Sequence, residues 1–443
     1  LRLFVFTLGI LFFFTACNRK ANTYLYKSEG NEFVFPEKDL NLKPAGICFS
    51  GGGTRAMTCA AGQMKALDSL DIWPHVGYIS SVSGGTWASS IFTYYRKGPK
   101  NDKELLCYPH NPKDLTIDYL KKPIPETQLV HAPTRDLTGR ILECLIEDDA
   151  SFGIFEKPSD IWIDAVGATY LEPFGLYGNR DYFSYNKATV KSIRKRNPKW
   201  KFRNRNFHLV HNKPGDAPRP YLVMNSAVLS PAKLLPLPSP EPMTVFNYSP
   251  LGIGAAKFRD ISVKNTTFPV GGGFTEPFAM KGYAPIQPIS KCGTERYCAE
   301  IELPKKHHFR LADAVGTSSA AFAADMAGSR LKGILSKLLA LGSLVPEEVY
   351  WAIQDDIQKA EEYRFADGGS LENFGLLSLL QRKVERVVVF INTDTQIDTN
   401  FIPSPNNPPV PKTIDTDFYT LFGDTSYDFG NQTNNHVFSK QDF

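Results

Sequence analysis

The sequence predicts an α/β fold in which a mostly parallel central sheet carries helices on both faces. Two neighbouring units within residues 44–96, with expected strands at 45–49 and 76–79, each pass from an apolar run through a turn containing glycine into a stretch with helical periodicity. A strand, a turn and a helix in succession form the unit from which parallel sheets are built. A third run, 387–391, is apolar and β-branched, which is typical of another central parallel strand.

The first unit begins with an expected buried strand at 45–49. It continues through Ser50-Gly51-Gly52-Gly53-Thr54-Arg55-Ala56 into a helix. One stripe of that helix, at three-to-four spacing, carries Met57, Ala60, Ala61, Met64 and Leu67. Such a stripe suits a helix packed on a sheet.

The second unit begins with an expected strand at 76–79 and turns at Ser81-Val82-Ser83-Gly84-Gly85. The helix that follows carries Trp87, Ile91 and Tyr94 on one stripe, which we interpret as core. Further along, 221–224 reads as a strand, and 311–326 as an alanine-rich helix interrupted at 316–319. Segment 365–369 closes a short strand, and a helix is expected over 374–382.

The chain of 443 residues divides unevenly. Residues 1–16 have the apolar run and small final residues of a signal peptide, and the run is shorter than the roughly 18 residues of a membrane span. Cys17 then resembles the lipidated cysteine of a bacterial lipoprotein, which predicts an exported protein anchored in an envelope membrane; free secretion is the alternative. We expect a tether over 17–43 and a single domain over 44–443, with a cap-like insertion at about 97–206.

The formal net charge of +4 is too small to indicate a nucleic-acid partner by itself. Eight Lys or Arg residues lie between Lys191 and Arg205, together with Trp200 and Phe202. A solvated loop is the simplest interpretation, and contact with an anionic membrane is the alternative. An export signal argues against nucleic acid as a partner.

Cysteine placement predicts one disulfide. Cys292 and Cys298 bracket a short polar segment and are the best candidates for a bond. Cys48 in an expected strand and Cys59 on an expected helix are interpreted as inert core thiols. No cysteine pair has the spacing of a zinc site with accompanying histidines, so no metal is expected.

Ser83 is the candidate nucleophile, because it stands at a sharp corner between a strand and a helix and is followed by two glycines. The usual elbow pattern, Gly-x-Ser-x-Gly, has Ser81 in place of its first glycine here. Ser80 and Ser81 compete for the role, but neither is followed by glycines. The positive end of the helix behind Ser83 favours negative charge that develops nearby.

The first glycine turn supplies candidate donors for that charge. The N–H groups of Gly52 and Gly53 are expected to form an oxyanion hole, and Arg55 could hold a phosphate through two parallel hydrogen bonds. The same turn also fits a loose dinucleotide-binding pattern. That alternative is weaker, because Asp71 precedes the second strand instead of ending it and the elbow at Ser83 would have no role.

Asp367 is the candidate base, since it stands at a strand end in the turn Ala366-Asp367-Gly368-Gly369 and can reach a cleft above the sheet. Asp313, within an alanine-rich helix, and Asp394, after a strand without glycines, are rivals. An ordinary Asp is a weak base, but burial would raise its pKa.

At these positions the chain resembles the catalytic domain of cytosolic phospholipase A2 and of fungal lysophospholipases, which are relatives of the patatins. The resemblance rests on Gly-Gly-Gly-Thr-Arg-Ala-Met (51–57), Met-Lys-Ala-Leu (64–67) and Val-Ser-Gly-Gly-Thr-Trp (82–87), with a looser match at 246–250. It implies a patatin-like fold with Ser83 as nucleophile and Asp367 as its only side-chain partner. It also implies that Gly52 and Gly53 form the oxyanion hole and that Arg55 binds the lipid phosphate.

The sequence therefore predicts a calcium-independent serine hydrolase, without cofactor, acting on the fatty-acyl esters of phospholipids or lysophospholipids at a membrane surface. Two alternatives stay open. One is an acyltransferase on the same fold, and the other is a catalytically silent lipoprotein that binds lipids or a partner protein.

Overall fold

The computed structural model describes residues 19–400 except 108–110, 115, 151–157, 179–180, 201–206, 235–241, 264–265, 286, 305–307, 321–344, 355–358, 394 and 397, together with 415 and 421. The expected signal peptide, Cys17, Phe202 and Asp394 therefore lie outside the described residues.

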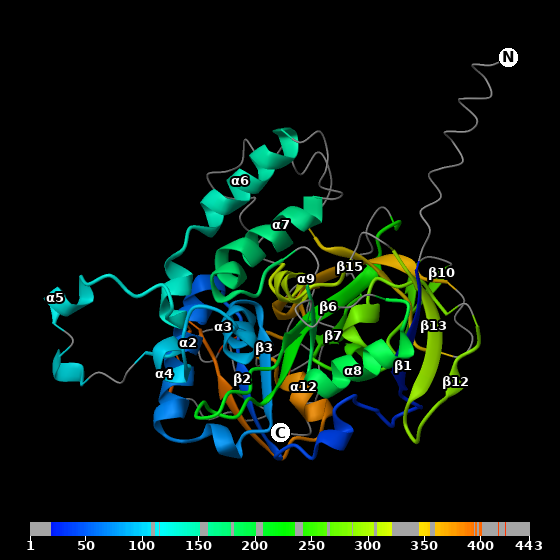
Figure 1. The fold of residues 1–443 in the computed structure, drawn as a ribbon, viewed down its shortest axis with the longest axis horizontal. Helices are drawn as coiled ribbons and strands as arrows, with labels where there is room; N and C mark the ends of the chain where they lie inside the picture. The colour runs from blue at the N-terminus through cyan, green and yellow to red at the C-terminus, as the bar shows by residue number, and fades with distance from the viewer. Residues whose placement is uncertain are drawn as a thin grey trace.

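A large mixed sheet forms the centre of the molecule (Figure 1). Along it the strand order is β12-β13-β1-β11-β8-β7-β6-β3-β2-β16, while β15 pairs with β6 and β14 with β15. Its strands are β1 (Arg19–Lys27), β2 (Ala45–Phe49), β3 (Tyr78–Val82), β6 (Tyr221–Pro231), β7 (Thr244–Tyr248), β8 (Ile253–Ala255), β11 (Gly273–Thr275), β12 (Ser290–Lys291), β13 (Tyr297–Leu303), β14 (Glu347–Tyr350), β15 (Glu361–Asp367) and β16 (Arg386–Phe390). Two small separate pairs are β4 (Tyr182–Ser184) with β5 (Phe207–Leu209), and β9 (Arg259–Val263) with β10 (Thr266–Val270).

The α/β prediction is confirmed, but the sheet is not mostly parallel. Only β16, β2, β3 and β6 run parallel to one another, and every other described pairing in this sheet is antiparallel. The expected central strand at 387–391 corresponds to β16, which ends the strand order, and its Val388 is 53% exposed. A β-branched run was therefore a correct sign of a parallel strand and a wrong sign of a central one.

Helices cover both faces of the parallel strands, because alternate residues of each strand point to opposite faces. On β2, Ile47 and Phe49 belong to the large core that contains α2 and α3, whereas Cys48 packs with Leu379 of α12 on the other face. All five apolar residues of the predicted first stripe, and all three of the second, are buried.

The α-helices are α2 (Gly53–Ser69), α3 (Ser83–Tyr94), α4 (Asp102–Leu105), α5 (Ile117–Leu120), α6 (Leu137–Ala150), α7 (Pro158–Val166), α8 (Lys187–Arg196), α9 (Leu311–Thr317) and α12 (Leu376–Gln381). Shorter helical turns are η2 (Lys38–Leu40), η3 (Trp73–His75), η4 (Pro112–Asp114), η5 (Leu129–Thr134), η6 (Gly167–Leu171), η7 (Glu172–Phe174), η9 (Pro277–Ala279) and η10 (Gly368–Ser370). None of the described helices is long and apolar enough to cross a membrane.

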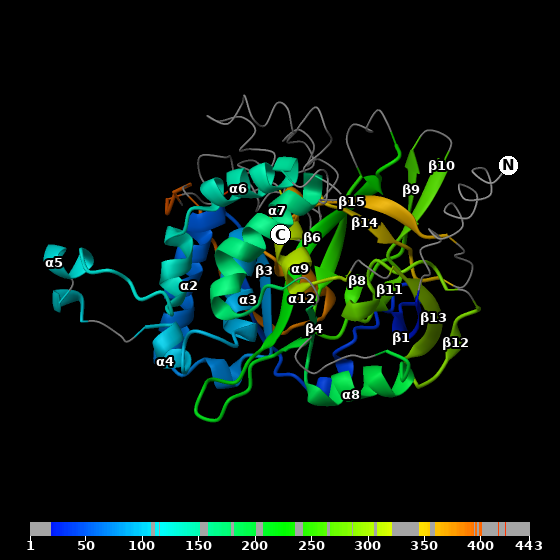
Figure 2. The ribbon, with the colours of Figure 1, turned by 45° about the horizontal axis from the view of Figure 1, so that its top comes forward.

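The expected insertion, 97–206, contributes elements to two places. Helices α6 and α7 lie together beside α9, as both views show (Figures 1 and 2), and the indole N–H of Trp162 donates to the Gly316 carbonyl of α9 at 2.9 Å. Helix α8 instead packs on β1 through Val190 and Ile193. The description of this segment as a cap stays a prediction.

Part of the expected tether is a strand. Residues 19–27 form β1, which lies between β11 and β13, and Ala21, Thr23 and Leu25 are buried in alternation. This alternation is the ordinary signature of a half-buried strand, so the tether prediction is wrong for these residues.

Candidate functional site

The ends of β3 and β15 meet beside one strand, β6. Strand β3 runs parallel to β6, and its last residue, Val82, pairs with Asn225. Strand β15 runs antiparallel to β6, and its last residue, Asp367, pairs with Ser226, the next position along. The two strands therefore approach each other end to end, and their C-terminal residues bring the chain to the same point from opposite directions.

Ser83 is the first residue after β3 and the first of α3, and it adopts φ +50°. Residues with a Cβ atom avoid this left-handed region, which is typical of a strained elbow. The competing serines lie inside the strand and are engaged there. The Ser80 hydroxyl donates to the Gly375 carbonyl at 2.6 Å, and Ser81 accepts from the Ser89 hydroxyl at 2.8 Å. Of the three serines, Ser83 alone stands at the corner.

The two glycine turns touch. A Cβ added at Gly84 would lie 1.9 Å from the carbonyl oxygen of Gly53, and one added at Gly85 would lie 2.5 Å from that of Phe49. A Cβ added at Gly51 would lie 3.1 Å from the Cβ of Ser83. The glycines after the elbow are therefore required for this contact, which brings the first turn against the corner at Ser83.

Gly52 and Gly53 adopt φ values of +127° and +60°, which glycine tolerates best, and Gly53 begins α2. The first N–H groups of a helix have no partner within the helix, and its positive end favours an anion. The N-terminus of α2 and the corner at Ser83 thus lie side by side. Arg55, also in the first turn of α2, is exposed.

Asp367 ends β15, and its side chain is 3% exposed. One carboxylate oxygen accepts the N–H of Gly369 at 2.6 Å. Asn373 lies between this turn and the first glycine turn, because its backbone carbonyl accepts the Gly51 N–H at 3.0 Å. Its amide oxygen would be 2.8 Å from a Cβ at Gly369.

The rival Asp313 is used elsewhere. It caps the start of α9 and forms ion pairs with Arg310 at 3.0 Å and Lys281 at 3.4 Å. Burial raises the pKa of Asp313, but Arg310 and Lys281 outweigh this effect and lower it to about 2. A carboxylate so strongly held in its ionised form is a poor base, which leaves Asp367 as the better of the two.

Ser318, just after α9, joins the two halves of the site. Its carbonyl oxygen accepts the N–H of Ser83 at 3.1 Å and the N–H of Gly368 at 3.4 Å. Ser83 and the residue after Asp367 are thus held by one oxygen atom. The sequence shows only an interrupted helix at 316–319 and no signal at Asn373, because serine and asparagine are not distinctive without the fold.

The looser matching segment, 246–250, includes the end of β7 and is connected through buried amides to the strands next to Ser83. Asn247 on β7 donates to the side-chain oxygen of Asn225 at 3.0 Å, and the amide of Asn225 donates to the Ser81 carbonyl at 2.9 Å. These buried amides tie β7, β6 and β3 together below the corner.

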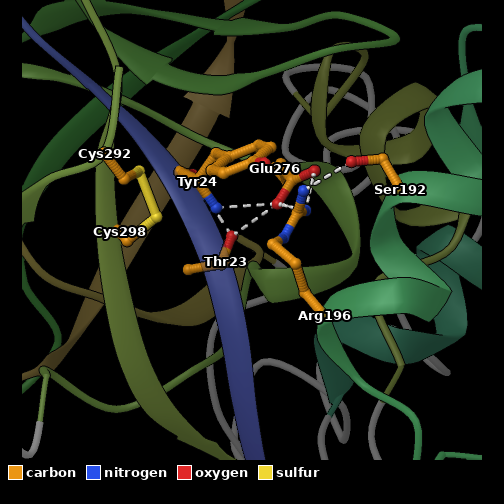
Figure 3. The surroundings of a disulfide bond; sticks show 7 residues. All are labelled: Thr23, Tyr24, Ser192, Arg196, Glu276, Cys292 and Cys298. Atoms are coloured by element: carbon orange, nitrogen blue, oxygen red, sulfur yellow. Dashed lines mark hydrogen bonds and ion pairs between the residues drawn. A yellow bond between two sulfur atoms is a disulfide. The ribbon is translucent and has the colours of Figure 1, made fainter.

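The disulfide prediction is confirmed: Cys292 and Cys298 are bonded, next to β13 (Figure 3). Cys48 is buried as expected, whereas Cys59 is exposed on α2, so its interpretation as a core thiol is wrong. In the basic stretch, Arg196 is neither solvated nor available to a membrane. It is paired with the buried Glu276 at 2.5 Å, and Figure 3 shows that carboxylate also accepting from Thr23 and Tyr24 of β1.

One cluster in the described part of the chain has the residue types of a metal site. Ligand atoms of Asp102, His211 and Asp216 lie within 4.8 Å of one another, near the C-terminal end of α3. However, Arg219 binds both oxygens of Asp102, at 2.7 and 2.5 Å. The guanidinium of Arg219 therefore already binds the Asp102 oxygens that a metal ion would need.

No model of a known protein family matches the sequence. Among solved structures, the chain is similar to human GIVD cytosolic phospholipase A2, with 15% identity and a TM-score of 0.43 over 79% of this chain and 45% of the human one. The human enzyme in complex with methyl gamma-linolenyl fluorophosphonate gives 18% identity and a TM-score of 0.30, over 72% and 34% of the two chains. The chain spans less than half the length of these structures.

Proposed function

We propose that the protein is a serine hydrolase that cleaves the fatty-acyl esters of glycerophospholipids or lysophospholipids. The observation that carries the proposal is the convergence on Ser318, whose carbonyl binds the N–H of Ser83 and that of Gly368. A nucleophile at a strained corner, a buried carboxylate in the adjacent turn and a helix N-terminus beside them are the groups that acyl transfer requires.

In this mechanism the Ser83 hydroxyl oxygen attacks the ester carbonyl while Asp367 accepts its proton. The N–H groups of Gly52 and Gly53 stabilise the tetrahedral oxyanion, where each donor of such a hole contributes about 3 kcal/mol. Asp367 then returns the proton to the departing alcohol oxygen. Water, deprotonated by the same carboxylate, releases the fatty acid and restores Ser83.

A phospholipid is the proposed substrate because Arg55 and the N-terminus of α2 offer a phosphate site next to the nucleophile. The resemblance of the motifs at 51–57 and 82–87 to those of phospholipases supports the same substrate class. We also propose export and a lipid anchor at Cys17. The disulfide supports export, since such bonds persist in oxidising compartments.

The test is hydrolysis of phospholipid vesicles carrying a labelled acyl chain, by wild type, Ser83→Ala and Asp367→Asn. Both variants are expected to lose at least about 10³-fold in rate, as when a member of a catalytic unit is removed. Ser90→Ala is the matched control, because Ser90 is a buried serine of the same helix whose hydroxyl donates only to the Trp87 carbonyl. Its rate should equal that of wild type.

Full activity in either site variant would overturn the mechanism. The same vesicles with added lysolipid distinguish hydrolysis from acyl transfer, because a transferase yields a new diacyl lipid instead of free fatty acid. A wild-type protein that neither hydrolyses lipid nor reacts with an alkyl fluorophosphonate would favour the silent lipid-binding protein.

A further inference from the structure

We infer that Ser318 is a positioning residue for the reaction, which sets the nucleophile and the base relative to each other. The inference rests on the proposed function. It concerns a segment, 316–319, whose sequence shows only an interruption of a helix, and whose place in the fold is the junction of α3, β6 and the turn after β15.

The backbone carbonyl of Ser318 gives the first part of the argument. It accepts two N–H groups, from Ser83 and Gly368, that belong to chain segments 285 residues apart. The Ser83 N–H lies at a corner with φ +50°, where no regular strand or helix bond is made. An acceptor from outside both elements therefore fixes the strained conformation, which is unfavourable without such support.

The side chain of Ser318 gives the second part. Its hydroxyl donates to the Asn225 carbonyl at 2.6 Å and lies 3.0 Å from the Thr86 hydroxyl of α3. Asn225 is the residue of β6 that pairs with Val82, immediately before the nucleophile. The Ser83 N–H is also 3.3 Å from this hydroxyl oxygen. The hydroxyl thus ties Ser318 to β6 and to α3, on either side of Ser83. It thereby fixes the position of the Ser318 carbonyl.

Burial makes these bonds effective. Ser318 is 0% exposed, as are Thr86 and the neighbouring Ser319. Removing one partner of a buried hydrogen bond leaves the other without that bond, which is costly away from water. Here that cost is borne by the Asn225 carbonyl, so the segment is expected to shift, and the reaction depends on sub-ångström placement.

The chain supplies a matched control in the next residue. The Ser319 hydroxyl donates to the Val315 and Gly316 carbonyls at 3.1 Å, both within its own helical segment. Ser318→Ala and Ser319→Ala therefore remove the same atom at the same burial, one facing the site and one facing away from it.

The experiment measures covalent labelling by an alkyl fluorophosphonate. The Ser83 oxygen bonds to phosphorus, fluoride leaves, and the hydroxyl proton passes to Asp367. Ser318→Ala is expected to slow labelling, and kcat for vesicle lipid, about tenfold or more at unchanged KM. Ser319→Ala is expected to stay within about twofold of wild type. Ser318→Thr, which keeps the hydroxyl, should recover most of the rate.

Equal labelling rates for Ser318→Ala and Ser319→Ala at equal folded fraction would overturn the inference while leaving the proposed function intact. If wild type is not labelled at Ser83, both fail. If Ser318→Ala does not fold, Thr86→Val replaces it, with Thr93→Val as control. The Thr93 hydroxyl is buried on the same helix and has no partner within the described structure. The inference then requires slower labelling in Thr86→Val alone.

Discussion

The two ends of α3 are both buried and polar, but they are built in opposite ways. At the C-terminal end, Arg219 is paired with Asp102 and lies 3.9 Å above the ring of Phe92. The remaining carboxylate, Asp216, accepts from the Asp102 N–H at 3.0 Å, from the Tyr95 hydroxyl at 3.1 Å and from His211 at 2.7 Å. Each carboxylate there is held by several donors, and the Tyr95 hydroxyl lies within hydrogen-bond distance of both.

At the N-terminal end, the polar groups are hydroxyls, glycine N–H groups and one carboxylate. The elbow at Ser83 has a strained φ, and α2 begins beside the same corner. Hydroxyl and N–H groups are what a reacting ester needs, whereas an ion network of this kind holds structure. Both ends of α3 are buried and polar, so burial and polarity do not distinguish them. The kind of hydrogen-bonding partner does: an ion pair at the structural end, and hydroxyl and N–H groups at the candidate site.

Substitution of Arg219 is the strongest test of the comparison between the two ends of α3. Arg219→Met leaves the carboxylate of Asp102 buried without its cation, which typically costs about 3–5 kcal/mol. We expect the free energy of unfolding, measured by urea titration, to fall by that amount. Labelling of Ser83 per folded molecule should be unchanged.

The double variant Asp102→Asn/Arg219→Met tests whether the unpaired charge of Asp102 causes this loss of stability. With the charge also removed, part of the lost stability should return. A double variant no more stable than Arg219→Met would mean that packing of the guanidinium on Phe92, not the ion pair, is what the single variant loses.

A third polar region, behind α9, lies between these extremes because its charges are unbalanced. Lys281 is shared by Asp313 and by Glu348, which is 2.9 Å away, and Asp160 adds a further acid. Burial, the largest effect, raises the pKa of Glu348 from 4.5 to about 7, with the charge of Asp313 adding to the rise and Lys281 opposing it. This region should therefore respond to pH.

The raised pKa of Glu348 means that the folded state holds a proton there between about pH 4.5 and 7 that the unfolded state has lost. Stability should accordingly fall as pH rises through that window, by up to about 3 kcal/mol. Glu348→Gln removes this slope from urea unfolding measured at pH 5 and pH 8. Glu347→Gln, on the opposite face of β14, should keep it. Identical slopes in both variants would contradict the assignment.

The contact between the two glycine turns offers a smaller and more local test. Gly84→Ala places a Cβ 1.9 Å from the Gly53 carbonyl, so one of the turns must move. We expect about a 100-fold slower labelling of Ser83, the effect of roughly 1 Å of misplacement. Gly62→Ala is the control, since a Cβ there meets nothing within 4 Å and α2 continues through it. Equal labelling in the two variants would show that the turns do not need this contact.

The sequence was sufficient for the local pieces of the site. The corner at Ser83, the strand β2 and both buried helix stripes follow from periodicity and from glycine placement within about 15 residues. The strand β1 was also readable from its alternation and was overlooked because it follows a leader-like segment. Its burial shows that proximity to a terminus is a poor argument for a tether.

The long-range pieces could not be predicted. That Asp367 and Val82 pair with adjacent residues of β6 depends on sheet register, which no local pattern encodes. The role of Ser318 depends on a backbone carbonyl, which every residue has. The antiparallel half of the sheet was missed for the same reason, since β1 pairs with β11 and β13, which lie far along the chain.

The smallest expected effect is that of added metal at the C-terminal end of α3. Zn²⁺ prefers carboxylate and imidazole ligands at about 2 Å, and Asp102, His211 and Asp216 offer those types. Both oxygens of Asp102 are held by Arg219, and hydrogen bonds from His211 and from the Asp102 N–H lower the pKa of Asp216 against the opposing effect of burial. A metal would have to displace a guanidinium that is 1% exposed.

We therefore expect Zn²⁺ at millimolar concentration, or a chelator, to leave the Tm within about 1 °C, since ligand binding to the native state would raise it. A rise in Tm with Zn²⁺ that His211→Gln abolishes would contradict this expectation. Such a rise would mean that Arg219 can leave Asp102, so that the saturated end of α3 is not a fixed support. The C-terminal end of α3 would then be a binding site that Arg219 fills when no metal is bound, and the fold itself would not make the two ends different.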